Sequence, residues 1–233
     1  MKTIGLLGGM SWESSAEYYR IINETIGNRL GGNHSAKCLM YSFDFAPIEE
    51  LQKAGNWEQA TVVMIEAAIS LQKGGADFLV ICTNTMHKMA DEVQQNIQIP
   101  LLHIVDAVAA QIVKQKYRKI GLLGTMFTME EAFYKGRLAD KYKLEVLIPQ
   151  KADRQIIHRV IYDELVSGKI VPSSRDEYKR IVETMVVKGA EAIILGCTEI
   201  GLLIKESDCT VPLFDTTKIH ALAAVDFALQ MSQ

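Results

Sequence analysis

The sequence contains only four cysteines in 233 residues, and no two of them form a CxxC pair. This spacing excludes the common zinc motifs, and four cysteines are too few for a disulfide scaffold, so we expect reduced thiols and no bound metal. Prolines number only five, and no low-complexity tract occurs. Together these absences favour an ordinary folded enzyme or binding protein.

The sequence also lacks a large excess of either charge and any long apolar run. The chain has 25 Lys and Arg against 28 Asp and Glu, and no dense basic run, which disfavours nucleic acid as a partner. The apolar stretch near the N-terminus is interrupted by Gly5, Gly8 and Gly9, so it is too short for a signal peptide or a membrane span. We therefore expect a cytoplasmic protein with no membrane partner.

What the chain does have is an internal repeat. The segment Ile4–Met10 recurs as residues 120–126, residues 75–83 recur more loosely as 189–197, and residues 99–102 recur as 211–214. Three matches in the same order indicate two halves of one design.

Each half has the pattern of alternating strands and helices. Short apolar runs at 3–8, 77–82, 119–124 and 191–196 predict parallel strands buried on both faces. Helical periodicity predicts helices at 13–30, with a capping-box pattern at residues 14–17, and at 57–73 and 174–188. The expected fold is therefore α/β, with two pseudo-symmetric doubly wound units, at 1–103 and 104–215, and a last helix at about 216–233 that packs back on the first.

Parallel sheets bind ligands beyond the carboxyl ends of their strands, so we expect a site in a cleft between the two units. Residues that follow the repeated strands would line it, at 8–11, 83–85, 125–126 and 197–199. The glycines at 5, 8 and 9 do not complete GxGxxG, and the repeat of Gly9 is Thr125, which favours a tight turn over a nucleotide cradle.

Two of these turns carry a specific signature. Thr83-Asn84-Thr85 follows one buried strand, and Gly196-Cys197-Thr198-Glu199 follows its repeat. Together they resemble the aspartate/glutamate racemase family. The final glutamate, and Gly8-Gly9-Met10-Ser11-Trp12, are typical of the aspartate racemase branch. The resemblance covers essentially the whole chain, and it implies a homodimer that acts on acidic amino acids without pyridoxal phosphate or any other cofactor.

The family uses one thiol from each half on opposite faces of the substrate Cα, and this chain departs from that rule. Alignment of the repeat places Thr83 at the position equivalent to Cys197, whereas Cys82 lies one residue too early and is expected to point into the sheet packing. We therefore predict racemisation by Cα proton abstraction and return, with Cys197 as the main acid/base, its pKa lowered by a following helix N-terminus, and with the L-enantiomer favoured.

The remaining predictions concern substrate binding. Backbone N–H groups of Asn84, Thr85, Thr198 and Glu199 and hydroxyls of Thr85, Thr125 and Thr198 would hold the carboxylates, with Met10 at the same edge. In some aspartate racemases the loop after the second strand carries an arginine. Residues 44–52 contain none, and Gln52 is a substitute that does not demand charge. The histidines at 87, 103 and 220 are interpreted as structural.

Two other functions stay open on the residues alone. An amino-acid sensor without catalysis would use the same fold, but binding does not need a thiol. A decarboxylase or isomerase of the same superfamily with a single catalytic cysteine would need Cys197 but not the polar turn at Asn84 and Thr85.

Overall fold

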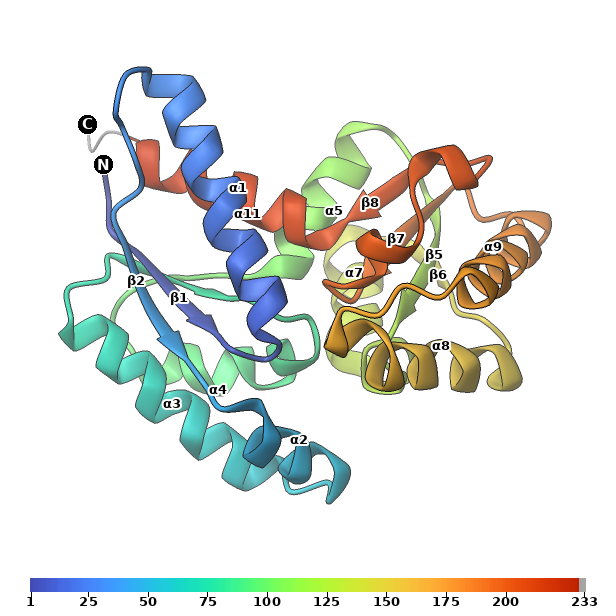
Figure 1. The fold of residues 1–233 in the computed structure, drawn as a ribbon, viewed down its shortest axis with the longest axis horizontal. Coiled ribbons are helices and arrows are strands. Elements are labelled where there is room, and N and C mark those ends of the chain that lie inside the picture. The colour runs from blue at the N-terminus through green and yellow to red at the C-terminus, as the bar shows by residue number, and fades with distance from the viewer. Residues whose placement is uncertain (231–233) are drawn as a thin grey trace. The chain divides into compact units, whose positions relative to one another are not determined.

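The computed structural model describes residues 1–230, and the chain divides into two compact units (Figure 1). The first unit comprises residues 1–103 together with the chain from His220 onward. The second comprises Ile104–Ile219. Each unit is built on one four-stranded sheet.

The first sheet has the strand order β2-β1-β3-β4, with every pair parallel. Its unit contains β1 (Ile4–Gly8), α1 (Trp12–Leu30), β2 (Cys38–Ser42), α2 (Phe45–Lys53), α3 (Trp57–Lys73), β3 (Phe78–Ile81), the 3₁₀ helix η1 (Thr85–Met89), α4 (Ala90–Gln95) and β4 (Leu101–Leu102).

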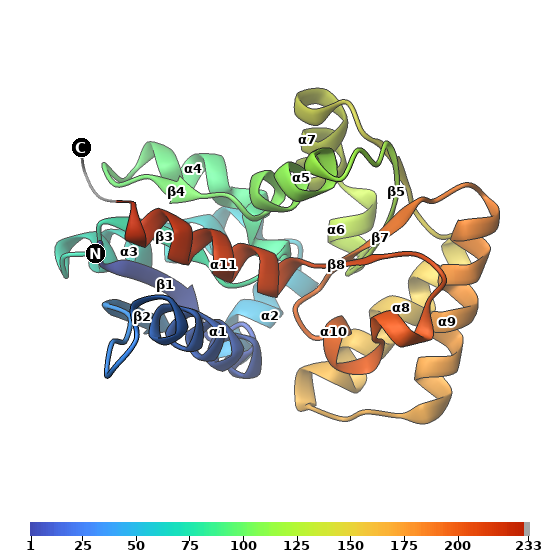
Figure 2. The ribbon, with the colours of Figure 1, turned by 90° about the horizontal axis from the view of Figure 1, so that it is seen from above.

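The second sheet has the equivalent order, β6-β5-β7-β8, and is also parallel throughout. Figure 2 labels three of its strands, β5, β7 and β8. Its unit contains α5 (Ile104–Lys114), β5 (Lys119–Gly124), α6 (Met126–Glu130), α7 (Ala132–Tyr142), β6 (Glu145–Leu147), α8 (Lys151–Asp163), η2 (Leu165–Ser167), α9 (Pro172–Val187), β7 (Ala192–Gly196), α10 (Ile200–Leu203), η3 (Glu206–Asp208) and β8 (Leu213–Asp215). Helix α11 (Thr216–Leu229) begins in this unit and continues into the first. Two parallel sheets with flanking helices confirm the predicted α/β fold class.

The central strands of the first unit are buried on both faces because helices cover both sides. Leu7, Leu79 and Ile81 face α3 and α4, whereas Leu6 and Val80 face α1 and α11. Each fully buried aliphatic side chain contributes roughly 1.5–3 kcal/mol. This alternation explains why the repeated strands appear in the sequence as unbroken apolar runs.

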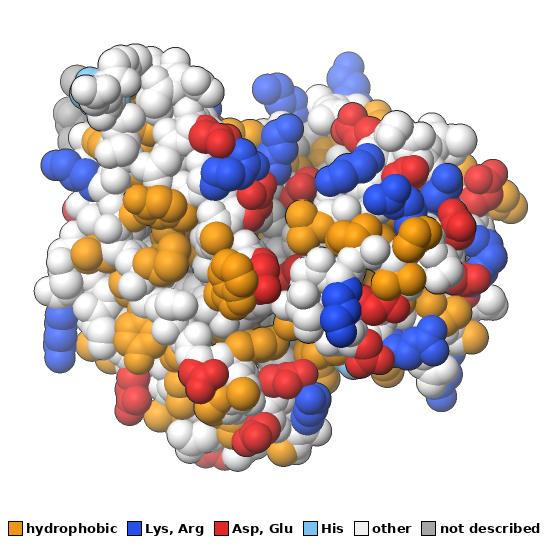
Figure 3. Space-filling model, in the orientation of Figure 1, with side chains coloured by type: hydrophobic (Ala, Val, Ile, Leu, Met, Phe, Trp, Pro, Cys, Tyr) orange, Lys and Arg blue, Asp and Glu red, His pale blue; other side chains and the backbone are white. Residues whose placement is uncertain are grey.

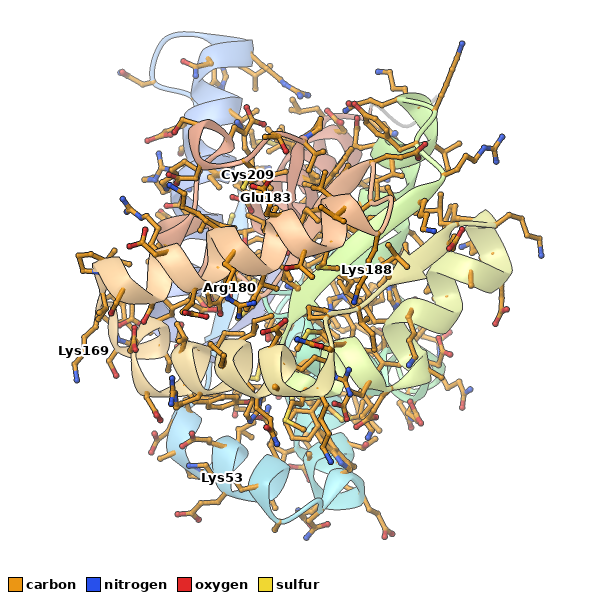
Figure 4. The ribbon with its side chains drawn as sticks, turned by 90° about the vertical axis from the view of Figure 1, so that its right-hand side faces the viewer. Lys53, Lys169, Arg180, Glu183, Lys188 and Cys209 are labelled. Atoms are coloured by element: carbon orange, nitrogen blue, oxygen red, sulfur yellow. The ribbon has the colours of Figure 1, made fainter. Side chains whose placement is uncertain are left out.

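The second unit has one continuous core. It joins β5 and β7 to α5, α7, α8 and α9. Figure 4 shows α9 alongside α8 with Arg180 between them, where its guanidinium donates to Asp153 Oδ1 at 2.6 Å. Asp153 is buried and Arg180 is half exposed, so this ion pair ties the outer edges of two core helices.

Two local predictions are wrong. Helix α1 begins at Trp12 with Ser11 as its N-cap residue, so Ser14 and Ser15 lie inside the first turn, where both hydroxyls donate to Ser11 O at 3.0 Å. Residues 44–52 are not a loop, because α2 starts at Phe45 and Asp44 Oδ1 accepts the N–H of Ala46.

In both sheets the order in which the chain adds strands reverses at the same position. The chain moves outward from β1 to β2 and then returns to β3, so the switch point lies between β1 and β3, and in the second sheet between β5 and β7. Ligands of parallel α/β sheets bind beyond the carboxyl ends of strands at this point. The polar turns at Thr83 and Cys197 follow β3 and β7 there.

The surface gives two further observations. Within residues 1–230 no helix is long and apolar enough to cross a lipid bilayer. On the face shown in Figure 3, Lys and Arg side chains are interspersed with Asp and Glu, so that face has no extended surface of one charge.

Candidate active site

The carboxyl end of β7 is set by a close approach between two glycines. Gly196 pairs with Gly124 of β5. A Cβ on Gly196 would lie 2.7 Å from Leu123 O, and a Cβ on Gly124 would lie 2.8 Å from Gly196 O. Only glycine allows the two strands this spacing, and Cys197 is the first residue beyond it.

Cys197 lies at the centre of a polar group on this turn. Its Sγ donates to Glu199 Oε2 at 2.9 Å, and the Thr198 hydroxyl donates to the same oxygen at 2.7 Å. Cys197 is only 8% exposed and Glu199 is buried. The arrangement pairs a thiol with a carboxylate in a water-poor setting, where one proton can be exchanged between sulfur and oxygen.

The pKa of Cys197 departs from the sequence expectation. Burial, followed by the negative charge of Glu199 and its hydrogen bond, raises the pKa of the thiol well above its usual range. The backbone N–H groups of Thr198 and Glu199 act in the predicted, lowering direction but are outweighed. Helix α10 has only four residues, so its dipole adds little.

In the equivalent turn of the first unit, the neighbouring residues Cys82 and Thr83 have different surroundings. Cys82 is 1% exposed and packs in the core beside Ile4, Leu6 and Val80, as expected for a side chain that points into the sheet packing. Burial raises the pKa of its thiol far above the usual range, so it stays protonated. Thr83 is 8% exposed, the same fraction as Cys197.

Strand register supports the same equivalence. Leu7 pairs with Ile81 in the first sheet, and Leu123 pairs with Leu195 in the second. Counting on from these pairs, Cys82 corresponds to Gly196 and Thr83 corresponds to Cys197. The hydroxyl and the thiol therefore occupy matching positions of the two repeats.

The turn after Thr83 is closed by His87. The His87 N–H donates to Asn84 O at 3.1 Å, and His87 Nδ1 lies 2.7 Å from Thr83 O. Asn84 and Thr85 are buried in this turn. Sequence reasoning interpreted His87 as structural, although its spacing four residues after Thr83 is the one signal that could have shown its contact with the strand end.

The other predicted binding residues have additional roles in their own units. Thr125 caps α6, with its hydroxyl oxygen accepting the Thr128 N–H at 3.2 Å. Gln52 is buried on α2, and its amide donates to Met86 Sδ at 3.1 Å. Met10 is buried in the core cluster that contains Leu7. Thr125 and Thr198 belong to the second unit, whereas Gln52 and Met10 belong to the first.

The sequence predicts a helix-capping role for Ser15, whereas the structure places its hydroxyl against the turn after β1. Gly9, at φ +87°, donates its N–H to Ser15 Oγ at 2.8 Å, and a Cβ on Gly8 would lie 2.5 Å from the same oxygen. The turn therefore depends on glycine at both positions for backbone conformation and space. Within the part of the chain that the structure describes, no group of three His, Cys, Asp or Glu residues is placed to hold a metal ion.

Comparisons with known proteins agree on one family. The sequence profile of the family described as Asp/Glu/Hydantoin racemase matches residues 7–224. The broad specificity amino-acid racemase RacX of Bacillus subtilis is 23% identical over 239 residues, spanning 95% of this chain and 96% of its own.

Two solved structures match over nearly their full length. A Yersinia pestis protein described as a candidate Asp/Glu racemase has 53% identity and a TM-score of 0.92, covering 99% of this chain and 100% of that one. An aspartate racemase homologue from Pyrococcus horikoshii has 34% identity and a TM-score of 0.82, covering 98% and 99%.

Proposed function

The chain belongs to the Asp/Glu/hydantoin racemase family, and on that premise we propose that it racemises acidic amino acids without a cofactor. Cys197 is the acid/base on one face of the substrate Cα, and Thr83 occupies the opposing position. The observation that carries this proposal is the contact of 2.9 Å between Cys197 Sγ and Glu199 Oε2 at the end of β7.

In this proposal the thiol–carboxylate pair allows a cysteine with a raised pKa to act as a base. Loss of the thiol proton to solvent would leave two negative charges side by side in a buried site, which is costly. Transfer of that proton to Glu199 leaves the net charge of the pair unchanged. The thiolate then takes the substrate α-proton: an S–H bond forms, the Cα–H bond breaks, and the electron pair stays on Cα and spreads into the α-carboxylate.

Substrate binding in this proposal uses both strand ends. Backbone N–H groups of Asn84 and Thr85 and the hydroxyls of Thr85 and Thr125 hold the two carboxylates, and Met10 and Gln52 are further binding residues in this proposal. The N–H groups of Thr198 and Glu199, also predicted to bind a carboxylate, bond the Cys197 thiol in this structure. Fixed dipoles of this kind stabilise developing negative charge, because they need no reorganisation during the reaction. We further propose that two copies of the chain form the functional dimer.

Reprotonation on the second face is the slow part of the scheme. A threonine hydroxyl is a far weaker acid and base than a thiol near neutral pH, so the proton comes slowly, either from Thr83 itself or from a water molecule that it holds. Removal and return of the proton at Cys197 alone exchange hydrogen without inversion. We therefore propose that the L-enantiomer, whose α-proton faces Cys197, exchanges faster than the D-enantiomer.

The test is racemisation of single enantiomers by protein dialysed against a chelator and hydroxylamine. Chiral chromatography of L-aspartate, L-glutamate and a panel of other amino acids should show both enantiomers accumulating, with Cys197→Ala as the inactive control. Turnover that depends on added pyridoxal phosphate or a divalent metal ion would overturn the proposal. Binding with no loss of the α-proton would favour a sensor, and net loss of CO₂ would favour a decarboxylase.

A further inference from the structure

We propose that His87 is a positioning residue that sets the direction of the Asn84 N–H group by holding the carbonyl of the Thr83–Asn84 peptide. The inference rests on the proposed function, in which this N–H binds a substrate carboxylate. It assigns a role to a buried histidine that lies outside the acid/base pair.

The inference rests on the contact between the His87 ring and Thr83 O, an oxygen that the His87 backbone N–H does not bond. In an α-helical turn the His87 N–H would donate to Thr83 O, four residues earlier. Here it donates to Asn84 O at 3.1 Å, in the tighter 3₁₀ pattern of η1. The His87 side chain reaches Thr83 O instead, with Nδ1 at 2.7 Å. A carbonyl only accepts hydrogen bonds, so His87 carries its proton on Nδ1.

Holding this carbonyl fixes the N–H on the other side of the same peptide unit. The six atoms of a trans peptide are coplanar, and its C=O and N–H point in opposite directions. With Thr83 O turned toward His87, the Asn84 N–H points away from His87. The hydrogen bond to the carbonyl also polarises the peptide unit and makes its N–H a stronger donor.

The His87 ring is itself held by a buried aromatic cluster. Its centroid lies 4.7 Å from that of His103 and 5.7 Å from that of His220. His220 Nε2 lies 2.8 Å from Leu102 O, and its Nδ1 lies 2.8 Å from the Tyr18 hydroxyl. The carbonyl requires a proton on Nε2, which leaves Nδ1 of the neutral ring to accept from Tyr18.

His220, one member of this cluster, is uncharged at neutral pH. Burial lowers the pKa of His220 to about 4. The His220 ring therefore keeps one tautomer around neutral pH. His87 packs against an uncharged ring that does not titrate in this range. Rotation of the His87 ring away from Thr83 would have to displace this packing, since His87 is only 2% exposed.

The experiment compares two amide variants of His87. The side-chain nitrogen of Asn takes the place of Nδ1, so His87→Asn retains a donor for Thr83 O. The nitrogen of Gln takes the place of Nε2, so His87→Gln does not. Met89→Leu, in the same 3₁₀ helix and equally buried, is the packing control. Thermal melts confirm that all three variants fold.

Two readouts separate positioning from mere packing. We expect kcat/KM for L-aspartate exchange to fall on the order of 10²-fold in His87→Gln, the usual effect of losing one fixed backbone donor, and to stay within about tenfold of wild type in His87→Asn. Amide NMR should show the Asn84 signal shifting on addition of L-aspartate in wild type, His87→Asn and Met89→Leu, but not in His87→Gln.

Equal kcat/KM and equal Asn84 shifts in the Asn and Gln variants would overturn the inference and leave the racemase proposal standing. An inactive wild-type protein whose Asn84 shift still depends on His87 would overturn the racemase proposal and support the positioning role.

Discussion

Cys197 and Cys82 both follow a buried central strand, yet their surroundings differ completely. The Cys197 thiol has a carboxylate oxygen at 2.9 Å. The Cys82 thiol makes a long contact of 3.8 Å with Val80 O and lies inside an apolar core. On the proposed mechanism, therefore, Cys197 does the chemistry, because its thiol has a group that can take its proton, and Cys82 only packs.

The two cysteines therefore give opposite results on truncation. Cys197→Ala should remove nearly all Cα proton exchange and leave the melting temperature within a few degrees of wild type. Cys82→Ala should retain exchange but lose about 1–2 kcal/mol of stability, because it opens a small cavity in a packed core. Exchange assays and urea denaturation of both variants check this, and comparable loss of exchange in the two would contradict the repeat alignment.

Glu199 should control how the reaction depends on pH. If the thiolate forms by the proposed transfer, which releases no proton to solvent, kcat/KM for the L-enantiomer should vary little across the neutral range. In Glu199→Gln the transfer is lost, and the rate at neutral pH should fall about 10²-fold. Removal of the carboxylate charge also lowers the pKa of Cys197, since Glu199 is one of the causes that raise it.

The residual rate of Glu199→Gln should then rise about tenfold per pH unit until the thiolate forms. Glu199→Asp, which keeps the charge, is the control. A Glu199→Gln profile that superimposes on wild type would show that the carboxylate does not handle the thiol proton.

For single residues, the sequence predicts which side chains follow the strands but not the pKa values that these side chains have in the fold. The repeat alignment identifies Thr83 and Cys197 as equivalent, because the period of a strand is short and strict. The raised pKa of Cys197 was not predicted, because it depends on burial and on the direction of the Glu199 side chain. Neither quantity is encoded in local spacing.

At the scale of elements, the paired glycines of β5 and β7 determine where Cys197 lies. Gly196→Ala should destabilise the protein by about 1–3 kcal/mol and lower exchange, because its Cβ would lie 2.7 Å from a backbone oxygen that cannot rotate away. Gly136→Ala, inside α7, is the matched control. Its Cβ would meet Ala132 at an ordinary 3.6 Å, so stability should rise by about 0.5–1 kcal/mol.

Urea denaturation measures the stability of both glycine variants, and the exchange assay measures their activity. Full exchange activity and unchanged stability in Gly196→Ala would show that the strand end can shift without affecting the site.

Elements were predictable in proportion to their burial. The repeated central strands and helix α3 were found with boundaries within a residue or two, because both faces or one whole stripe are apolar. The sequence does not indicate helix α2, because this helix is short and partly exposed, and its tertiary position rather than its pattern stabilises it.

At the scale of the whole molecule, the repeat produces two units with separate cores and the same strand order. The first unit is completed only by α11, whose small residues Ala221, Ala224 and Ala228 pack against β1 and β3. His220 lies at the start of this docked segment and bonds Leu102 O, so it links the chain's last helix to the end of the first sheet.

This placement makes stability depend on pH. An unfolded histidine titrates near 6.5, whereas the folded pKa of His220 is about 4. Between these values the unfolded chain binds a proton that the folded chain does not, so the free energy of unfolding falls as pH drops from 6.5 to 4, by at most on the order of 3 kcal/mol.

Urea denaturation at pH 7 and pH 4.5 should show this loss in wild type. It should be smaller in His220→Gln, where an amide still donates to Leu102 O but no longer titrates. The same pH dependence in both proteins would assign the loss to other groups.

The central claim, one thiol on one face and a threonine on the other, is tested most directly by hydrogen exchange in heavy water. L-aspartate and D-aspartate are incubated separately with the wild-type protein and with Thr83→Cys, and loss of the Cα–H signal is followed by proton NMR beside inversion by chiral chromatography. In wild type, L-aspartate should exchange quickly, D-aspartate slowly, and inversion should match the slower rate. Thr83→Cys should raise D-side exchange and inversion together, by about 10²-fold if a thiol restores general acid–base catalysis. Equal exchange rates for the two enantiomers in the wild-type protein would contradict the account, because the group opposite Cys197 would then be as competent as the thiol itself.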